Sequence, residues 1–247
     1  KKGRSGFPGR PLFVSFGQST IVELDADKKE RWRHRLSNPW ACQGLPNGNR
    51  LIAAFAQNQN IIVEFSEDGK EIWRKEKLPS IPYSVQRLEN GNTLVCCADV
   101  QQVIEISPDG SSKSTQVAGR PMYAQRLENG NTLIALQQGG RVIEQDPKNQ
   151  IVWEARGMNG PCFCQRLDTG NTLIVQMHTG QVVEVDGSGQ KTVWTSKVPL
   201  VNPICAQRLS NGNTLISDNN GVVEVDPTGQ QVKWRHAQNN VTGVSQF

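Results

Sequence analysis

The sequence has few aromatic residues, little excess charge and no long apolar run, and each shortage excludes a class of protein. Aromatic residues make up 6% of the 247, and the formal net charge is +4. No apolar stretch approaches the ~20 residues that a membrane helix needs, so we expect no membrane span. Lysine and arginine are scattered, apart from short clusters at residues 1–10 and 28–35, which argues against nucleic acid as a partner.

The chain offers little from which to infer a compartment. Its first residues, KKGRSGFPGR, lack Met, which indicates a processed or trimmed product. Its six cysteines do not have the paired spacing of a zinc site or of a small disulfide scaffold. The compartment stays open, and an exported protein, periplasmic or at the cell surface, is favoured.

A turn sequence recurs along the whole chain. LENGNTLV at residues 88–95 has close copies in LPNGNRLI, LENGNTLI, LDTGNTLI and LSNGNTLI, and their glycines follow one another at steps of 43, 39, 40 and 42 residues. A degraded sixth copy, FPGRPLF, places Gly9 39 residues before Gly48. Six units of about 40 residues therefore fill the chain.

Each unit predicts four short strands and no helix. The first strand ends in QRL and is followed by an Asn-Gly turn, because both residues accept the positive φ of a tight hairpin. The second strand reads NTLI, and the third reads VVEV or IVEL, which is apolar enough to pack on both faces. The fourth strand carries Trp in five units, and a proline then opens the next unit. These residues are Trp32, Trp73, Trp153, Trp194 and Trp234, and Pro39, Pro82, Pro121, Pro161 and Pro203.

Four-stranded antiparallel units of this period are typical of the blades of a β-propeller. We predict an all-β, six-bladed β-propeller formed by residues 1–247 as a single domain. Its blades fall at about residues 39–78, 79–118, 119–158, 159–200 and 201–240, and the last combines 241–247 with 7–38. The C-terminal VTGVSQF fits the missing first strand of the unit that begins near Phe7, so it closes the ring by joining the N-terminal blade.

Two motifs resemble known propeller repeats. SEDGKEIW at residues 66–73 and VDPTGQQVKW at 225–234 resemble the outer-strand motif of quinoprotein-type repeats, and RLxNGNTLI followed by VVEVDP is similar to arylsulfotransferase-like propellers. The resemblance covers nearly all of the chain and implies the fold, but it lies in the skeleton of the blades and implies no chemistry. The chain departs from the pattern at Ser114, where the other units have Trp, and enzymes of both families are longer.

The adjacent cysteines Cys96 and Cys97 resemble the pair found beside the quinone in some quinoprotein dehydrogenases. Other units carry Ala, Leu, Val or Gln at these positions, so packing in a buried strand explains them better than redox chemistry. Cys42 and Cys164 share one register of the inner strand and also indicate packing. We therefore expect no cofactor and no metal ion.

A glutamate recurs in the third strand of all six units, and an arginine follows the glutamine of QRL in four. They are Glu23, Glu64, Glu105, Glu144, Glu184 and Glu224, and Arg87, Arg126, Arg166 and Arg208. A residue present in every blade indicates architecture rather than a single site. We predict that these carboxylates pair with Arg, Lys or backbone amides within or between blades, because a partly buried charge needs a partner.

The units differ most in the loops opposite the NGN turns, on a side that we call the loop face. It holds the connections from each outer strand to the next inner strand and from second to third strands, and loops carry binding sites. Aromatic rings there suit a sugar ring while amides and carboxylates satisfy its hydroxyls, and the same composition suits a protein surface. The predicted ligand-binding residues are Trp40, Tyr83, Tyr123, Phe163, Gln57, Asp99, Gln138, His178, Asp218 and Asn219.

Three functions stay open, with a non-catalytic module favoured over an enzyme. The first is binding of an unidentified polar small molecule or carbohydrate, with Trp40 as anchor unless that ring only packs over the channel. The second is a scaffold for a protein partner. The third is an enzyme acting on a small polar substrate with His178 as acid or base, since imidazole titrates near neutrality. We expect a monomer.

Overall fold

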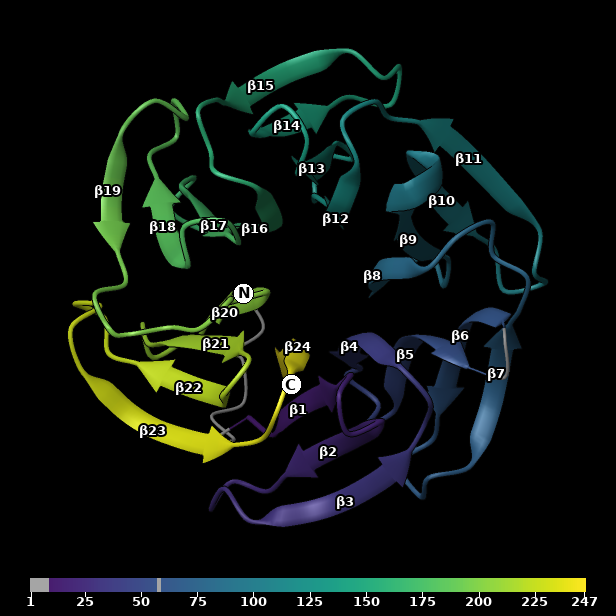
Figure 1. Cartoon of the computed structure of the whole chain (residues 1–247). Coiled ribbons are helices and arrows are strands. Elements are labelled where there is room, and N and C mark those ends of the chain that lie inside the picture. The colour runs from purple at the N-terminus through teal and green to yellow at the C-terminus, as the bar shows by residue number, and fades with distance from the viewer. Residues whose placement is uncertain (1–8, 57–58) are drawn as a thin grey trace.

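Six four-stranded antiparallel sheets are arranged around a central axis. A computed structural model describes residues 9–56 and 59–247, and within this part it contains 24 strands. One strand of each sheet lies next to the axis and another lies at the rim (Figure 1). The prediction of an all-β, six-bladed β-propeller is confirmed. In the same part of the chain, no helix is long and apolar enough to cross a membrane.

We number the blades along the chain and give their strands from axis to rim. The first blade contains β24 (Val241–Gln246), β1 (Pro11–Ser15), β2 (Thr20–Leu24) and β3 (Glu30–Arg35). The second contains β4 (Pro39–Gly44), β5 (Arg50–Ala56), β6 (Gln59–Phe65) and β7 (Glu71–Lys75). The third contains β8 (Pro82–Arg87), β9 (Thr93–Cys97), β10 (Gln102–Ile106) and β11 (Ser112–Gln116).

The remaining three blades follow the same plan. The fourth contains β12 (Pro121–Arg126), β13 (Thr132–Leu136), β14 (Arg141–Gln145) and β15 (Ile151–Ala155). The fifth contains β16 (Pro161–Arg166), β17 (Thr172–Gln176), β18 (Gln181–Val185) and β19 (Thr192–Thr195). The sixth contains β20 (Cys205–Arg208), β21 (Thr214–Asp218), β22 (Gly221–Val225) and β23 (Val232–Ala237). A short 3₁₀ helix, η1 (Ala98–Val100), joins β9 to β10, where the sequence predicted no helix.

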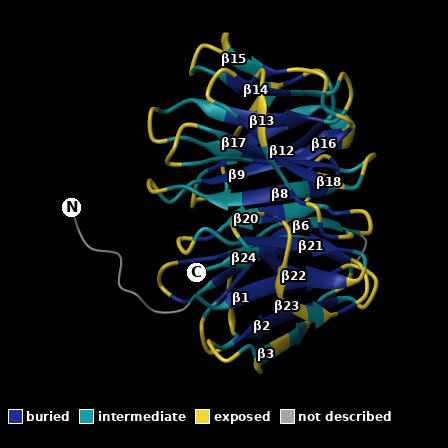
Figure 2. Ribbon diagram, turned by 90° about the vertical axis from the view of Figure 1, so that its left-hand side faces the viewer, coloured by how far each residue is buried: buried dark blue, intermediate teal, exposed yellow. Residues whose placement is uncertain are grey.

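The two ends of the chain close the ring. Strand β24 pairs antiparallel with β1, with Val244 opposite Phe13, and the amide of Arg10 donates to the carbonyl of Phe247 at 2.9 Å. The predicted closure by the C-terminal strand is confirmed, although Phe7 lies outside the described residues. The two middle strands of each sheet are largely buried, the strands beside the axis are partly buried, and exposure rises toward the loops and outer strands (Figure 2).

The NGN turn differs from the predicted hairpin in one respect. Only its glycine has a positive φ, for example 84° at Gly91, and the preceding asparagine does not. The Asn90 side chain instead accepts a hydrogen bond from the amide of Asn92 at 3.0 Å. The Asn92 side chain then donates to Glu105 at 2.7 Å. The turn therefore needs glycine for its backbone, and both asparagines for their side chains.

The repeated glutamates join neighbouring blades, as predicted. Five of them, all but Glu23, accept from the second asparagine of their own turn, and four pair with the arginine of the next blade. These pairs are Glu64 with Arg87 at 2.6 Å, Glu105 with Arg126 at 2.9 Å, Glu144 with Arg166 at 2.7 Å, and Glu184 with Arg208 at 3.0 Å. Glu23 pairs with Arg10, Arg31 and Arg50, and Glu224 pairs with Lys28 at 3.7 Å. The repeated glutamates and arginines thus have a structural role, because they join neighbouring blades.

The register of the outer strand corrects one alignment made from the sequence. In five blades a tryptophan stands opposite the repeated glutamate, next to a β-bulge, as Trp153 stands opposite Glu144. In the third blade β11 pairs with β10 without a bulge, and Lys113 stands opposite Glu105. Lys113, and not Ser114, therefore takes the position of the missing tryptophan.

Candidate binding site in the central channel

A cavity of about 180 Å³ lies on the propeller axis and is lined by the innermost strand of every blade. The strand order brings the six units to this point, because the first strand of each unit faces the axis (Figure 1). Within residues 9–56 and 59–247, every residue that lines the cavity is uncharged. They are Trp40, Ala41, Cys42, Gln43, Tyr83, Val85, Gln86, Met122, Tyr123, Gln125, Cys162, Phe163, Gln165, Ile204, Cys205, Ala206, Gln207, Thr242, Gly243, Val244 and Ser245.

A bulge at the start of four inner strands turns aromatic side chains toward the axis. The pairing register shifts directly after the proline, so that Trp40 and Tyr83 are extra residues with no opposite partner. Pro39, Pro82, Pro121 and Pro161 begin their strands as predicted, but β20 begins at Cys205, two residues after Pro203. Two successive residues of one strand can therefore both reach the cavity, as Met122 and Tyr123 do.

The four predicted aromatic residues form two contacting pairs within the cavity wall. The rings of Trp40 and Tyr83 meet edge to face with centroids 5.0 Å apart, and those of Tyr123 and Phe163 are tilted with centroids 4.4 Å apart. Such contacts hold the rings in fixed orientations. The structure thus brings together Trp40, Tyr83, Tyr123 and Phe163, which the sequence placed on the same face.

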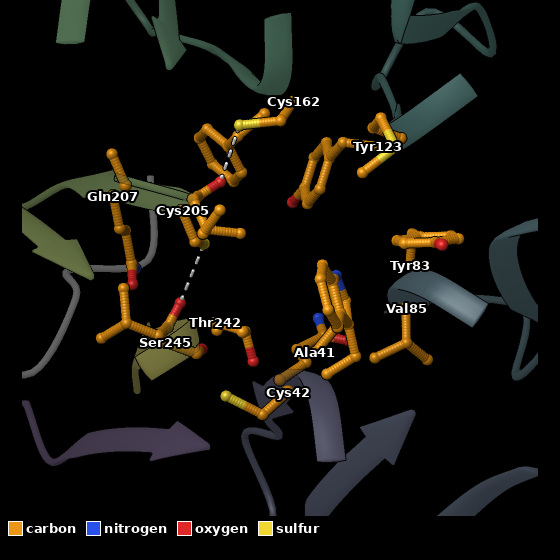
Figure 3. A pocket seen from close by; sticks show the side chains of 18 of the residues that line it. Ala41, Cys42, Tyr83, Val85, Tyr123, Cys162, Cys205, Gln207, Thr242 and Ser245 are labelled. Atoms are coloured by element: carbon orange, nitrogen blue, oxygen red, sulfur yellow. Dashed lines mark hydrogen bonds between the residues drawn. The ribbon is translucent and has the colours of Figure 1, made fainter. Parts of the chain in front are cut away.

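The hydroxyl of Tyr123 points into the cavity (Figure 3). Among the described residues it has no hydrogen-bond partner, although the ring itself is half-buried. Burial raises the pKa of this phenol well above its ordinary value, so the hydroxyl stays protonated and can donate. Tyr123 therefore offers a fixed donor to a ligand.

A ring of side-chain hydrogen bonds surrounds the other end of the cavity. In five blades a glutamine oxygen accepts from a backbone amide of the next blade, as Gln43 does from Arg87 at 2.6 Å and Gln125 does from Arg166 at 2.8 Å. Ser245 takes the same place in the first blade and accepts from Gly44 at 3.2 Å. These glutamines were missed as site residues, although four of them stand in QRL, which marks them in the sequence; Gln43 stands in QGL.

Among the predicted polar ligands that the structure describes, Asp99 alone forms a side-chain hydrogen bond to a residue of the cavity wall. The hydroxyl of Tyr83 lies 3.3 Å from a carboxylate oxygen of Asp99, and Arg120 pairs with the same carboxylate at 3.1 Å. Burial raises the pKa of Tyr83. Arg120 was not predicted. It has φ of 58°, a conformation that three other units reach before the proline with Asn38, Gly160 and Asn202 and that is unfavourable for arginine.

The other predicted polar residues lie apart from the cavity. Asp218 is fully buried, and its carboxylate accepts from the amides of Val201 at 3.1 Å and Asn220 at 2.8 Å. Asn219 contacts the backbone of neighbouring loops, and Gln138 is exposed with its amide bonded to Gly119. These three residues do not line the cavity. Gln57 lies outside the described residues.

His178 is exposed and does not line the cavity. Its ring lies against Gly160, where an added Cβ would be 2.6 Å from Nδ1. Within the described part of the chain, no carboxylate accepts a hydrogen bond from this ring. The geometry thus gives His178 neither a substrate pocket nor a partner that would orient it.

The cysteines pack as predicted. Cys96 and Cys97 follow one another in β9, are both fully buried, and belong to two different apolar clusters on opposite faces of the sheet. Burial raises the pKa of Cys96 to about 12 and that of Cys97 to about 11. Both thiols therefore stay protonated and are poor nucleophiles.

The residues that line the cavity do not fit a quinone cofactor with a calcium ion, the group that the resemblance to quinoprotein-type enzymes would imply. Calcium needs several carboxylate or carbonyl oxygens, and no Asp or Glu is among the described residues that line the cavity. The same described lining contains no Arg or Lys that could pair with the carboxylates of a quinone.

The chain is thus a six-bladed β-propeller built from quinoprotein-like repeats around an uncharged axial cavity. Residues 1–162 match the model of the family described as outer membrane protein assembly factor BamB, and the chain belongs to this family. A comparison with curated proteins gave no significant match.

Solved structures share the fold at low sequence identity. A protein of unknown function from Bacteroides caccae is 18% identical with a TM-score of 0.79, covering 97% of this chain and 98% of that chain. Streptogramin B lyase is 13% identical with a TM-score of 0.71, at coverages of 96% and 83%. A chain of the nidogen/laminin complex is 10% identical with a TM-score of 0.73, at coverages of 96% and 97%. These similarities show the fold alone.

Proposed function

We propose that the protein is a non-catalytic binding module, acting as one monomeric domain, whose central cavity takes one uncharged, polar, ring-shaped ligand such as a sugar. One observation carries this proposal: among the residues that the structure describes, the lining combines four aromatic rings with amide and hydroxyl groups and includes no charged side chain. An aromatic wall stacks on the apolar face of a sugar ring, while amides and hydroxyls pair with its hydroxyls.

Each group of the cavity has a role in this proposal. Trp40 and Tyr83 provide the stacking surface, and Met122 and Phe163 line the cavity from the fourth and fifth blades. Tyr123 donates from its hydroxyl, and Gln207 and the other glutamines offer amide groups beside the backbone bonds that fix them. The volume of about 180 Å³ suits a single ring better than an oligomer, because drug-sized ligands occupy about 300–1,000 Å³.

Calorimetric titration with neutral methyl glycosides and the corresponding uronic acids tests the proposal. A neutral sugar is expected to bind, and its acid to bind at least about tenfold more weakly, because the cavity cannot pair with a carboxylate. Tyr123→Phe removes only an unpaired hydroxyl, so this variant should fold normally and lose affinity. Equal affinity of the Tyr123→Phe variant, or binding of neither sugar, would refute the proposal.

A second candidate function is supported by the loop face. The exposed ring of Phe16 meets Trp40 edge to face at 5.7 Å and continues the row to Tyr83. An aromatic row that begins with an exposed ring and continues through two half-buried ones suits a protein partner. The family is described as an outer membrane protein assembly factor, which supports an exported protein with a protein partner. Affinity capture that Phe16→Ala abolishes and Tyr123→Phe leaves intact would favour this scaffold over the sugar-binding module.

The enzyme alternative receives the least support. His178 would have to act on the loop face outside the cavity, without a carboxylate to orient its ring. Turnover of a small polar substrate that His178→Ala abolishes would restore this alternative.

A further inference from the structure

A cation from one blade covers an indole from the blade before it at five of the six contacts between neighbouring blades. We call these contacts seams. The cation-to-ring pairs are Arg50 with Trp32, Arg87 with Trp73, Arg166 with Trp153, Arg208 with Trp194, and Lys28 with Trp234, at 4.2 to 5.1 Å. In three seams the indole nitrogen also donates to a carbonyl in the outer turn of the next blade, as Trp194 does to Pro227 at 2.9 Å.

The seam between the third and fourth blades has the cation without the ring. Arg126 pairs with Glu105 as in the other seams, but Lys113 stands where an indole would lie. Within the described residues, Lys113 forms no ion pair, and no aromatic ring lies beneath the Arg126 guanidinium. One face of this guanidinium is therefore open.

A groove of about 160 Å³ occupies the position of the missing ring. Its apolar walls come from Leu94, Val103, Val117 and Ile134. Its charged residues are two cations, Arg126 and Lys113, and two carboxylates, Glu105 and Asp146. Pro147, at the turn position that Pro227 has in the sixth blade, also lines it. A cavity of about 150 Å³ holds a benzene ring, so the groove has room for most of an indole.

We propose that this groove binds the tryptophan side chain of an extended segment of a partner polypeptide. The ring would stack on Arg126, as the chain's own indoles do in the other seams, and its nitrogen would donate to the carbonyl of Pro147. The proposal thus takes its geometry from five examples within the same molecule. It is independent of the central cavity.

The edge of the blade indicates that the tryptophan belongs to a polypeptide. Strand β11 (Ser112–Gln116) is the outer edge of the third blade, and four of its five residues are exposed. The other five outer strands carry a bulge, which hinders pairing with an added strand, whereas β11 runs in continuous register. An extended peptide can therefore pair with β11 and place one side chain in the groove.

Titration of isotope-labelled protein with acetyl-Ser-Trp-Ser-amide, followed by NMR, tests this site. Shifts are expected at the Arg126 side chain and at the Lys113 and Asn149 amides, with saturation. Acetyl-Ser-Leu-Ser-amide should give none, and the peptide with N1-methyltryptophan should bind several-fold more weakly, because it cannot donate to Pro147. Shifts elsewhere, equal binding of the leucine peptide, or tighter binding of free tryptophanamide would overturn the proposal.

Two substitutions on β11 provide a matched pair. Lys113→Trp places an indole in the groove and should reduce peptide affinity at least tenfold, whereas Ser112→Trp adds an indole outside the groove and should leave affinity unchanged. Undiminished binding by Lys113→Trp would contradict the site. If that variant does not fold, the N1-methyl peptide tests the same contact on the unaltered chain.

Discussion

Gly44 and Arg50 are cross-strand partners, and four other blades carry different residues at these two positions. Those blades pair an arginine of the first strand with a threonine of the second, as Arg126 pairs with Thr132. In the second blade the arginine is on the second strand, and it still reaches Glu23 of the neighbouring blade at 2.5 Å. The glycine leaves space for the ring of Phe247, the last residue. With glycine on the first strand and arginine on the second, this blade keeps its ion pair with Glu23 and still makes room for the C-terminal segment that closes the ring.

Replacing Arg50 by Met should lower the free energy of unfolding by about 3–5 kcal/mol, since it leaves a buried carboxylate with fewer partners. Glu23 is fully buried and keeps only Arg10 and Arg31 in this variant. Denaturant unfolding measures the change. Arg33→Met is the control, because its exposed pair with Glu30 should contribute less than about 1 kcal/mol. Equal losses in both variants would contradict the inference.

Gly44→Ala should weaken ring closure. A Cβ at this position would lie 1.8 Å from Cδ1 of Phe247, so the terminal ring must leave its place beside Arg10. A lower melting temperature is expected, and Phe247→Ala should restore much of the loss in the double variant, because the clash is then removed. Additive losses in the double variant would show that Gly44 is needed for another reason.

Glu144→Gln tests the junction between blades. The carboxylate accepts from Asn131 at 2.7 Å on one oxygen and from Arg166 at 2.7 Å on the other, and a neutral amide cannot satisfy both donors. Loss of a hydrogen bond to a charged group costs about 1.5–3 kcal/mol, and in a domain of this size that lowers the melting temperature by roughly 3–12 °C. Glu128→Gln, at an exposed position, should leave it unchanged. An unaltered melting temperature for Glu144→Gln would refute the structural role.

The repeats made the fold predictable, because each local signal occurs five or six times with the same spacing. Because the glutamate recurs in all six units, the sequence predicted a structural pairing with cations, and the ion pair of Glu64 with Arg87 is one example. The site was less predictable. A strand residue such as Gln125 reaches the cavity only through the way six blades meet, and the bulge before Tyr123 depends on pairing between strands. Lys113 was misaligned because a missing bulge shifts the register without changing the composition.

The stability of the protein should fall as the pH drops below about 6.5, and two histidines of the outer strands should contribute to this fall. Burial lowers the pKa of both His34 and His236. The charge of Arg33 lowers the pKa of His236 further. The carboxylates of Glu71, near His34, and Glu30, near His236, act in the opposite direction but do not outweigh the burial.

Aromatic packing accounts for this burial. The ring of His34 packs on Phe65 with centroids 4.5 Å apart, and that of His236 packs on Phe13 at 5.1 Å. The unfolded chain therefore binds a proton at each histidine at a higher pH than the folded chain. The contribution to stability is complete above the unfolded pKa, near 6.5, and is lost as the pH falls through the folded pKa.

Melting temperatures measured between about pH 7.5 and pH 5 should therefore decrease, and the decrease should be smaller in a double variant with His34→Asn and His236→Asn. His178→Asn is the matched control, because this exposed ring packs on no aromatic side chain within the described residues. An identical decrease in the double variant and the unaltered chain would show that the acidic residues alone produce it.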